Sequence, residues 1–300
     1  MDIGIGLPTY MRGISLETTL EWARRAEAHD FASVGTLDRL VYPNYDPLIA
    51  LSAVAAVTRG IRLITSVLIT PYRNTAVLAK QTASLDRLSG GRLVLGVGLG
   101  GRSDDYEAAR INTRGRGGQL SSQLEELKRI WAGEKRGFAG RIGPDPARSG
   151  GPQLLVGGDS PAALRRMARC ADGWVARAGS PEAFTQHYPM VLAAWEAAER
   201  SGKPRVVALA GFGLGPKARE ETRHILGDYY AYAGPHAERI AASALVTVEA
   251  IREAVAGFDS AGCDELLMFP AMADPGQVDL LAEALKHSNV NNALLSSTGR

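Results

Sequence analysis

The chain has 300 residues, of which 45% are hydrophobic and 22% are charged, and its formal net charge at pH 7 is +2. This composition is typical of a globular protein, and so small a net charge gives no support for binding to nucleic acid or anionic membranes. No apolar run reaches the roughly 18 residues of a membrane span, and the first residues do not follow the pattern of a signal peptide. The two cysteines, Cys170 and Cys263, show no metal-ligand spacing, so we expect no metal site and a reducing, cytoplasmic compartment.

Short apolar runs alternate with amphipathic segments along the whole chain. We expect strands, in chain order, at residues 3–7, 33–37, 62–69, 93–97, 153–156, 173–176, 206–210 and 265–269. Continuous apolar runs are typical of parallel strands that are covered on both faces. Eight such strands, each followed by a helix, predict a single (β/α)₈ TIM barrel over residues 1–285. Residues 286–300 are mostly small and polar, and we expect a frayed tail.

Three helix starts are marked by a capping residue followed by proline. They are Asp46-Pro47, Ser160-Pro161 and Ser180-Pro181. The capping oxygen accepts an N–H that has no partner inside the helix, and proline lacks an N–H at a position where none is needed. Two polar segments interrupt the alternation, at residues 101–118 and 133–152. Neither shows a clear helical pattern, and both are interpreted as long loops that are either lids or solvated excursions.

The most informative segment is residues 85–101. A helix ends at Leu88, the chain turns at Gly90 and Gly91, and a buried strand leads into the glycines at 96, 98, 100 and 101. Glycine permits a tight turn and lets a ligand approach the main chain closely. The same glycines fit the spacing of a Rossmann-type NAD(P)-binding fingerprint. That alternative fits poorly, because no helix opens at the third glycine and no acidic residue ends a strand about 20 residues later.

In a barrel, the functional residues lie at the carboxyl ends of the strands and in the loops after them. There the sequence offers mostly neutral side chains, with Tyr10, Asp38 and Arg39 as the polar candidates. None of the five histidines is placed at a strand end, and neither a Ser/His/Asp arrangement nor a His-Glu-X-X-His motif is present. We therefore expect a cofactor to carry the chemistry.

The best candidate for a phosphate site is Gly157-Gly158-Asp159-Ser160. It follows an apolar strand and opens a capped helix, and a helix N-terminus presents free N–H donors and a partial positive charge. An ordinary strand-to-helix turn is the alternative interpretation.

The segment 85–101 also resembles the signature of the bacterial luciferase-like, flavin-dependent oxidoreductases. Further segments match that family in order, at residues 2–8, 36–39, 65–74, 154–161 and 171–175. The resemblance extends over about residues 2–285 and implies a single barrel that uses reduced FMN or the deazaflavin F420 to reduce or oxygenate a small organic substrate. It also implies a homodimer or higher homo-oligomer and, with FMN, a separate flavin reductase.

The resemblance implies where the cofactor binds. The cofactor-binding candidates are Asp38, Ser66, Val67, Leu68, Gly98, Gly100, Asp104, Gly157, Gly158, Asp159 and Ser160. In that family the glycine pair of the 157–160 segment holds the cofactor phosphate, and a cis peptide bond at Ser66–Val67 backs the ring. The catalytic residues stay open, with Asp38, Arg39 and Tyr10 as candidates. Asp38 would contact the flavin or the substrate, or else form a cap or a buried salt bridge.

Two departures from known subfamilies separate this chain from their activities. The sugar-phosphate dehydrogenases of the family have a histidine after the aspartate and an acidic residue in the fourth loop, whereas this chain has Arg39 and Gly101. The histidine of the light-emitting luciferases is also not found. Because the lining has no obvious acid or base, and because the family includes members with decayed sites, a flavin-binding barrel without turnover is the competing hypothesis. The arginine-rich segment 101–118 is expected to close over the bound cofactor, with an ordered loop in a dimer interface or a solvated loop as the alternatives.

Overall fold

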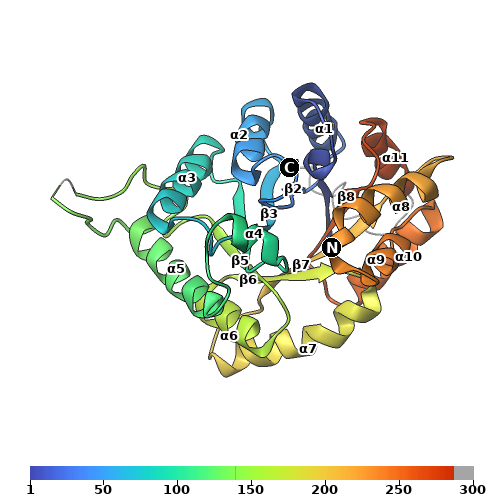
Figure 1. The fold of residues 1–300 in the computed structure, drawn as a ribbon. Helices are drawn as coiled ribbons and strands as arrows, with labels where there is room; N and C mark the ends of the chain where they lie inside the picture. Colours follow the sequence, from blue (N-terminus) through green and yellow to red (C-terminus); the bar gives the residue numbers. More distant parts are fainter. Residues whose placement is uncertain (139, 287–300) are drawn as a thin grey trace, which may run out of the picture.

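In a computed structural model, which describes residues 1–138 and 140–286, eight parallel strands close into a barrel (Figure 1). Each strand pairs with its neighbours in chain order, and β1 pairs with β8. The strands are β1 (Asp2–Gly6), β2 (Ser33–Thr36), β3 (Arg62–Ile69), β4 (Leu93–Gly98), β5 (Gln153–Gly157), β6 (Gly173–Ala178), β7 (Arg205–Phe212) and β8 (Glu265–Pro270). All eight predicted strands are confirmed, and the closed barrel excludes the Rossmann alternative.

Helices surround the barrel, as Figure 1 shows. They are η1 (Pro8–Tyr10), α1 (Leu16–Ala28), α2 (Pro47–Val57), α3 (Thr75–Leu88), α4 (Ser103–Ala108), α5 (Arg116–Trp131), α6 (Pro161–Cys170), α7 (Pro181–Ala197), α8 (Ala218–Tyr229), η2 (Ala231–Ala233), α9 (His236–Ala242), α10 (Val248–Ser260) and α11 (Gly276–Leu285). Within the described part of the chain, no helix is long and apolar enough to cross a membrane.

The predicted helix caps are present. Asp46 Oδ1 accepts from the backbone N–H of Leu48 at 2.9 Å, and the hydroxyl oxygens of Ser160 and Ser180 each accept from the N–H three residues later. The prolines that follow these three residues occupy the first helical positions. These caps fix where three of the loops at the carboxyl end of the barrel stop, and they therefore position the site.

The carboxyl-terminal half of β3 is irregular and is packed against glycines. The Ser66–Val67 peptide bond is cis, as predicted, and the register with β4 shifts between Thr65 and Leu68. A Cβ atom at Gly96 would collide with the Thr65 carbonyl oxygen, and one at Gly98 would lie 2.5 Å from Val67 Cγ2. The glycines of β4 thus make room for β3, and not only for a ligand as the sequence suggested.

Two segments differ from the sequence-based expectation. Residues 101–118 were expected to lack a clear helix, but they contain α4 and the first turn of α5. The insertion between β7 and α10, which folds as α8, η2 and α9, was not predicted as a distinct feature. The segment between α5 and β5 is a long loop, as expected, and it projects from the barrel (Figure 1). Of the predicted tail, all but Lys286 lies outside the described residues.

Apolar side chains fill two layers. One lies between the strands and the surrounding helices and includes Trp22 and Leu68, and the other lies inside the barrel and includes Ile64 and Leu267. Both cysteines are buried and free. The inner layer reaches the carboxyl end of the barrel at Tyr10 and Phe269, where it becomes the wall of the site.

Candidate active site

A small apolar hollow, with about 30 Å³ of free space, opens at the carboxyl ends of the strands. It is lined by Tyr10, Leu37, Ala178, Gly179, Leu209, Ala210, Gly211, Leu226, Tyr230, Ile240, Ser243 and Phe269. Most of these residues lie in or just after β1, β2, β6, β7 and β8. The others come from α8, from α9 and from residues next to these two helices. A concave, mostly apolar site at this end of a barrel is the usual place for a ligand.

The titratable groups among these lining residues are the phenols of Tyr10 and Tyr230. Burial raises the pKa of both phenols above the ordinary value, and neighbouring tyrosines add to the rise. The Tyr10 hydroxyl donates to the carbonyl oxygen of Pro270 at the end of β8. Both phenols are therefore neutral at pH 7 and can act as hydrogen-bond donors, but not as bases.

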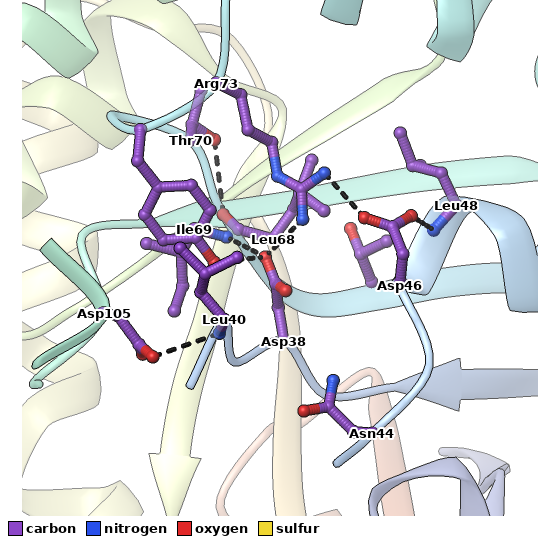
Figure 2. Close-up of polar contacts among 12 residues, drawn as sticks. Asp38, Leu40, Asn44, Asp46, Leu48, Leu68, Ile69, Thr70, Arg73 and Asp105 are labelled. Atoms are coloured by element: carbon purple, nitrogen blue, oxygen red, sulfur yellow. Dashed lines mark hydrogen bonds and ion pairs between the residues drawn. The ribbon is translucent and has the colours of Figure 1, made fainter. Parts of the chain in front are cut away.

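Asp38, a catalytic candidate, connects β2 to the loop after β3 (Figure 2). Its Oδ2 accepts from the N–H of Ile69 at 2.8 Å, from Arg73 Nη2 at 3.0 Å and from the Tyr72 hydroxyl at 3.3 Å. Arg73 also pairs with Asp46, the cap of α2. The Asp38 carboxylate therefore holds the loop after β2 to the loop after β3, which agrees with the salt-bridge interpretation of this residue.

Burial and ion pairing act against each other at this pair. Burial raises the pKa of Asp38 above its ordinary value, and the charge of Arg73 offsets only part of that rise. Burial would lower the pKa of Arg73, but the two carboxylates of Asp38 and Asp46 outweigh it and raise that pKa. Asp38 is thus held in an ion pair by Arg73 while its burial favours the neutral carboxyl.

Arg39, the next residue, has a different environment. Its side chain is buried, with the residue 8% exposed, and its guanidinium lies over the ring of Tyr42 at 4.1 Å and that of Tyr229 at 5.1 Å. Nη1 donates to the Tyr229 carbonyl oxygen at 2.7 Å, and Nη2 donates to the Val41 carbonyl oxygen at 3.2 Å. No carboxylate of the described residues forms a salt bridge with it, and its Nε has no hydrogen-bond partner.

Arg39 lines a second, wider hollow of about 540 Å³. The lining residues are Arg12, Arg39, Val41, Tyr42, Pro43, Arg102, Asp104, Asp228, Ala231 and Tyr232. Asp104, a predicted cofactor-binding residue, lies here in the first turn of α4 and pairs with Arg102. None of the residues of the predicted phosphate turn after β5 lines this hollow.

The turn Gly157–Ser160, the predicted phosphate site, connects β5 to the capped start of α6. Gly158 has a φ of +109°, and its carbonyl oxygen accepts from the indole N–H of Trp174 at 2.8 Å. Asp159 pairs with Arg177, whose hydrogen bond lowers the pKa of that carboxylate. The backbone N–H groups at this helix start can receive an anion, although the Asp159 charge opposes it unless Arg177 stays paired.

The predicted cofactor-binding residues in β3 and after β4 have different surroundings. The Ser66 hydroxyl is buried and has no hydrogen-bond partner, and Val67 packs against the inner apolar layer. Leu68 is completely buried in the outer layer, so its side chain does not face the hollow. Gly98 lies under Val67, and a Cβ at Gly100 would lie 2.8 Å from Ile69 Cδ1.

These positions provide a test of fit for a flavin-type cofactor. The unpartnered Ser66 hydroxyl would suit a polar edge of a flat ring, and the 157–160 turn would suit a phosphate, although neither of them lines either hollow.

Sequence reasoning missed the aromatic wall between the two hollows. Tyr229 lies 5.0 Å from both Tyr10 and Tyr230, measured between ring centroids. Tyr232 lies under Arg102 at 4.6 Å. Three tyrosines within residues 229–232 were a visible signal, but nothing in the sequence placed the insertion after β7 over the barrel mouth.

Comparison with known proteins agrees with this architecture. A family model described as luciferase-like monooxygenase matches residues 3–267. An uncharacterised protein of Mycobacterium tuberculosis (strain H37Rv) is 30% identical over 241 residues, which are 70% of this chain and 83% of that protein. An F420-dependent glucose-6-phosphate dehydrogenase of Nakamurella multipartita is 31% identical over 194 residues, 59% of this chain and 57% of the relative.

Among solved structures, the oxygenating constituent of 3,6-diketocamphane monooxygenase from Pseudomonas putida, in complex with FMN, superposes with a TM-score of 0.73. It covers 96% of this chain and 97% of its own, at 16% identity. The likeness to this FMN-bound structure thus concerns the fold. Because the family model spans nearly the whole barrel, the chain belongs to the luciferase-like monooxygenase family.

Proposed function

We propose that this protein is an oxidoreductase that uses the deazaflavin F420 to transfer a hydride to or from a small organic substrate. The observation that carries the proposal is the apolar hollow, whose titratable lining groups are two neutral tyrosines. Such a site cannot supply a strong base or nucleophile at pH 7, so the reactive group has to be brought in. When bound, a reduced deazaflavin supplies the hydride.

The protein's own residues would bind the cofactor and the substrate and would shield them from water. The backbone N–H groups of Gly158 and Ser160 would hold the phosphate, and the buried Ser66 hydroxyl would meet a polar edge of the ring. Tyr230 would donate a hydrogen bond to a carbonyl or hydroxyl oxygen of the substrate. Around it, Leu37 and Phe269 exclude water from the hollow.

F420 is preferred over FMN because of sequence similarity. The dehydrogenase of Nakamurella multipartita, which is named as F420-dependent, is 31% identical over its matched segment. The FMN-bound neighbour shares only the fold at 16% identity. The substrate is expected to differ from glucose 6-phosphate, because Arg39 stands where the sugar-phosphate dehydrogenases of the family have a histidine.

A binding titration tests the cofactor. Protein freed of bound small molecules is titrated with F420 and, separately, with FMN, and the fluorescence of each cofactor is followed. We expect F420 to bind at least tenfold more tightly than FMN. A preference for FMN would contradict the F420 assignment and favour the monooxygenase alternative.

Stopped-flow mixing with oxygen tests the reaction class. The protein loaded with reduced F420 should stay reduced in air-saturated buffer and be oxidised only by an organic acceptor such as a ketone. If the protein loaded with reduced FMN instead gives a transient hydroperoxide spectrum, it is a monooxygenase. If the loaded protein reacts with neither oxygen nor a broad panel of acceptors, the binding-only barrel is correct.

A further inference from the structure

We propose that Arg39 is a specificity residue that binds an anionic group, a carboxylate or phosphate, on the substrate. The inference rests on the proposed function, because it assigns the substrate class of the same site. It starts from an imbalance: the structure buries a guanidinium at the edge of the site without giving it a carboxylate.

Burying an unpaired cation is unfavourable, and proteins usually pair it. The structure offers Arg39 two carbonyl oxygens and three tyrosine rings, which are those of Tyr42, Tyr229 and Tyr232. Those contacts orient the guanidinium and stabilise its charge in part. The Nε–H still has no partner although it is buried, so the donor set of this side chain is incomplete.

The other charges of the second hollow are matched. Arg12 pairs with Asp228 at 2.8 Å, and Asp228 also accepts from the Tyr42 hydroxyl. Arg102 pairs with Asp104 and lies 3.8 Å from the buried carboxylate of Asp105. Of the three arginines that line this hollow, Arg39 is therefore the one that forms no salt bridge within the described part of the chain, although the charges of Asp104 and Asp105 act on it from a distance.

The aromatic wall connects this cation to the apolar hollow. Arg39 lies over the ring of Tyr229, and Tyr229 contacts Tyr10 and Tyr230, which line the apolar hollow. A substrate with an apolar body and an anionic end could place the body against these rings and the charged end against Arg39. Arginine suits this task, because its fork of donors matches the oxygens of carboxylates and phosphates.

Two sources could supply the anion, namely the substrate or the acidic tail of the cofactor. We assign it to the substrate, because the predicted phosphate turn follows β5, whereas Arg39 follows β2 and faces a hollow lined by α4, α8 and η2. The experiment below separates the two sources.

The test is calorimetric binding of matched probe pairs to the F420-loaded protein, which requires no turnover. The pairs are benzoate with methyl benzoate, hexanoate with methyl hexanoate, and phenyl phosphate with phenol. We expect at least one anion to bind tenfold or more tightly than its neutral counterpart. Arg39→Met, which keeps an apolar stem between the rings, should remove that preference, and Arg39→Lys should retain part of it.

Arg200→Met is the matched control. Arg200 also lies over an aromatic ring, at 4.1 Å from the Trp195 centroid, and donates to a backbone carbonyl, but it follows α7 away from both hollows. This variant should keep the wild-type preference. Circular dichroism and the melting temperature verify that each variant is folded.

Three results would overturn the inference. They are equal binding of all anions and their neutral counterparts, an anion preference that survives in folded Arg39→Met, and an anion preference seen in cofactor-free protein but abolished by F420. The last would assign Arg39 to the cofactor tail. None of them depends on hydride transfer, so failure here is distinct from failure of the proposed function.

Discussion

The buried charges of this barrel divide into those that hold the fold and those that face the site. Glu265 belongs to the first kind. It is fully buried at the start of β8, where it pairs with Arg62 of β3 and Arg205 of β7 and accepts from the Ser33 hydroxyl of β2. One carboxylate thus connects four strands at the end of the barrel opposite the site.

Replacing Glu265 with alanine should destabilise the protein by about 3 kcal/mol, because two arginines lose their shared carboxylate in a buried position. Urea unfolding measures this change. Asp145→Ala, which breaks the exposed pair with Arg141, is the control and should cost less than about 0.5 kcal/mol. If the two variants unfolded at similar urea concentrations, the buried cluster around Glu265 would contribute little to the free energy of unfolding.

Glu27 of α1 predicts a pH dependence. Its carboxylate accepts from the backbone N–H groups of Arg59, Gly60 and Ile61 at 2.8, 2.7 and 3.1 Å. Burial alone would raise the pKa of Glu27, but these three donors lower it. A lowered pKa contributes stability above the unfolded value of about 4.3, and that contribution is lost as the pH falls through the folded value.

Glu27→Gln should therefore cost about 1 kcal/mol at pH 7, and its cost should disappear as the pH approaches 3. Urea unfolding of both proteins between pH 3 and 7 checks this. Glu196 is exposed, so Glu196→Gln is the control. Its free energy of unfolding should differ little from that of the unchanged protein. If Glu27→Gln destabilised the protein more at pH 3 than at pH 7, this explanation would be contradicted.

At the scale of the elements, local patterns were enough for the strands and for the caps. The run around Leu93 predicted β4, and Ser160 predicted the start of α6, because burial and capping depend on neighbours in the chain. The site was predicted less completely. Arg39 and Tyr229 are 190 residues apart and meet only because the barrel brings the loop after β2 and the insertion after β7 together at one end. Such contacts have no local signal.

Gly158 tests the predicted phosphate turn. Its φ of +109° disfavours any side chain, and a Cβ there would lie 3.2 Å from the Cβ of Ala163. Gly158→Ala should lower stability by about 1–2 kcal/mol and also weaken F420 binding by about tenfold, because it crowds the N–H groups that would hold the phosphate.

Gly140→Ala controls for backbone strain. Gly140 has a similar φ of +104°, has open space where a Cβ would lie, and is in the loop between α5 and β5. It should lower stability without changing the dissociation constant of F420. Unchanged F420 affinity in Gly158→Ala would place the phosphate elsewhere.

The segment 101–118 was predicted to act as a lid, and the structure restricts where a lid could move. Asp105 Oδ1 accepts from the N–H groups of Leu40 and Val41, and the Tyr106 hydroxyl donates to the Leu99 carbonyl oxygen (Figure 2 shows the Leu40 contact). These contacts anchor α4, whereas residues 112–115 are exposed.

Hydrogen exchange should therefore show cofactor-dependent protection in residues 109–115, with α4 protected in both states. Protection of 109–115 that rises with protein concentration instead would indicate an interface between copies of the chain. Equal exchange with and without cofactor would contradict the lid.

For the whole molecule, the site exists only when the barrel is closed. The apolar hollow takes Tyr10 from after β1, Leu37 from after β2, Ala178 from β6 and Phe269 from β8, so no part of the chain can form it alone. A ligand of this hollow should therefore bind the native state and have little affinity for the unfolded chain. Its binding free energy then adds to the stability of the entire barrel.

F420 at 100 times its dissociation constant should add about 2.7 kcal/mol and raise the melting temperature by about 4 °C, given the unfolding entropy expected of 300 residues. Differential scanning fluorimetry with increasing F420 measures this shift, and Gly158→Ala should need about ten times more F420 to reach it. Because the hollow joins both halves of the barrel, tryptophan fluorescence and far-UV circular dichroism should report the same shift. A shift seen by one probe alone would mean that the ligand stabilises a part of the molecule that unfolds independently, and the closed barrel would not be the unit that binds.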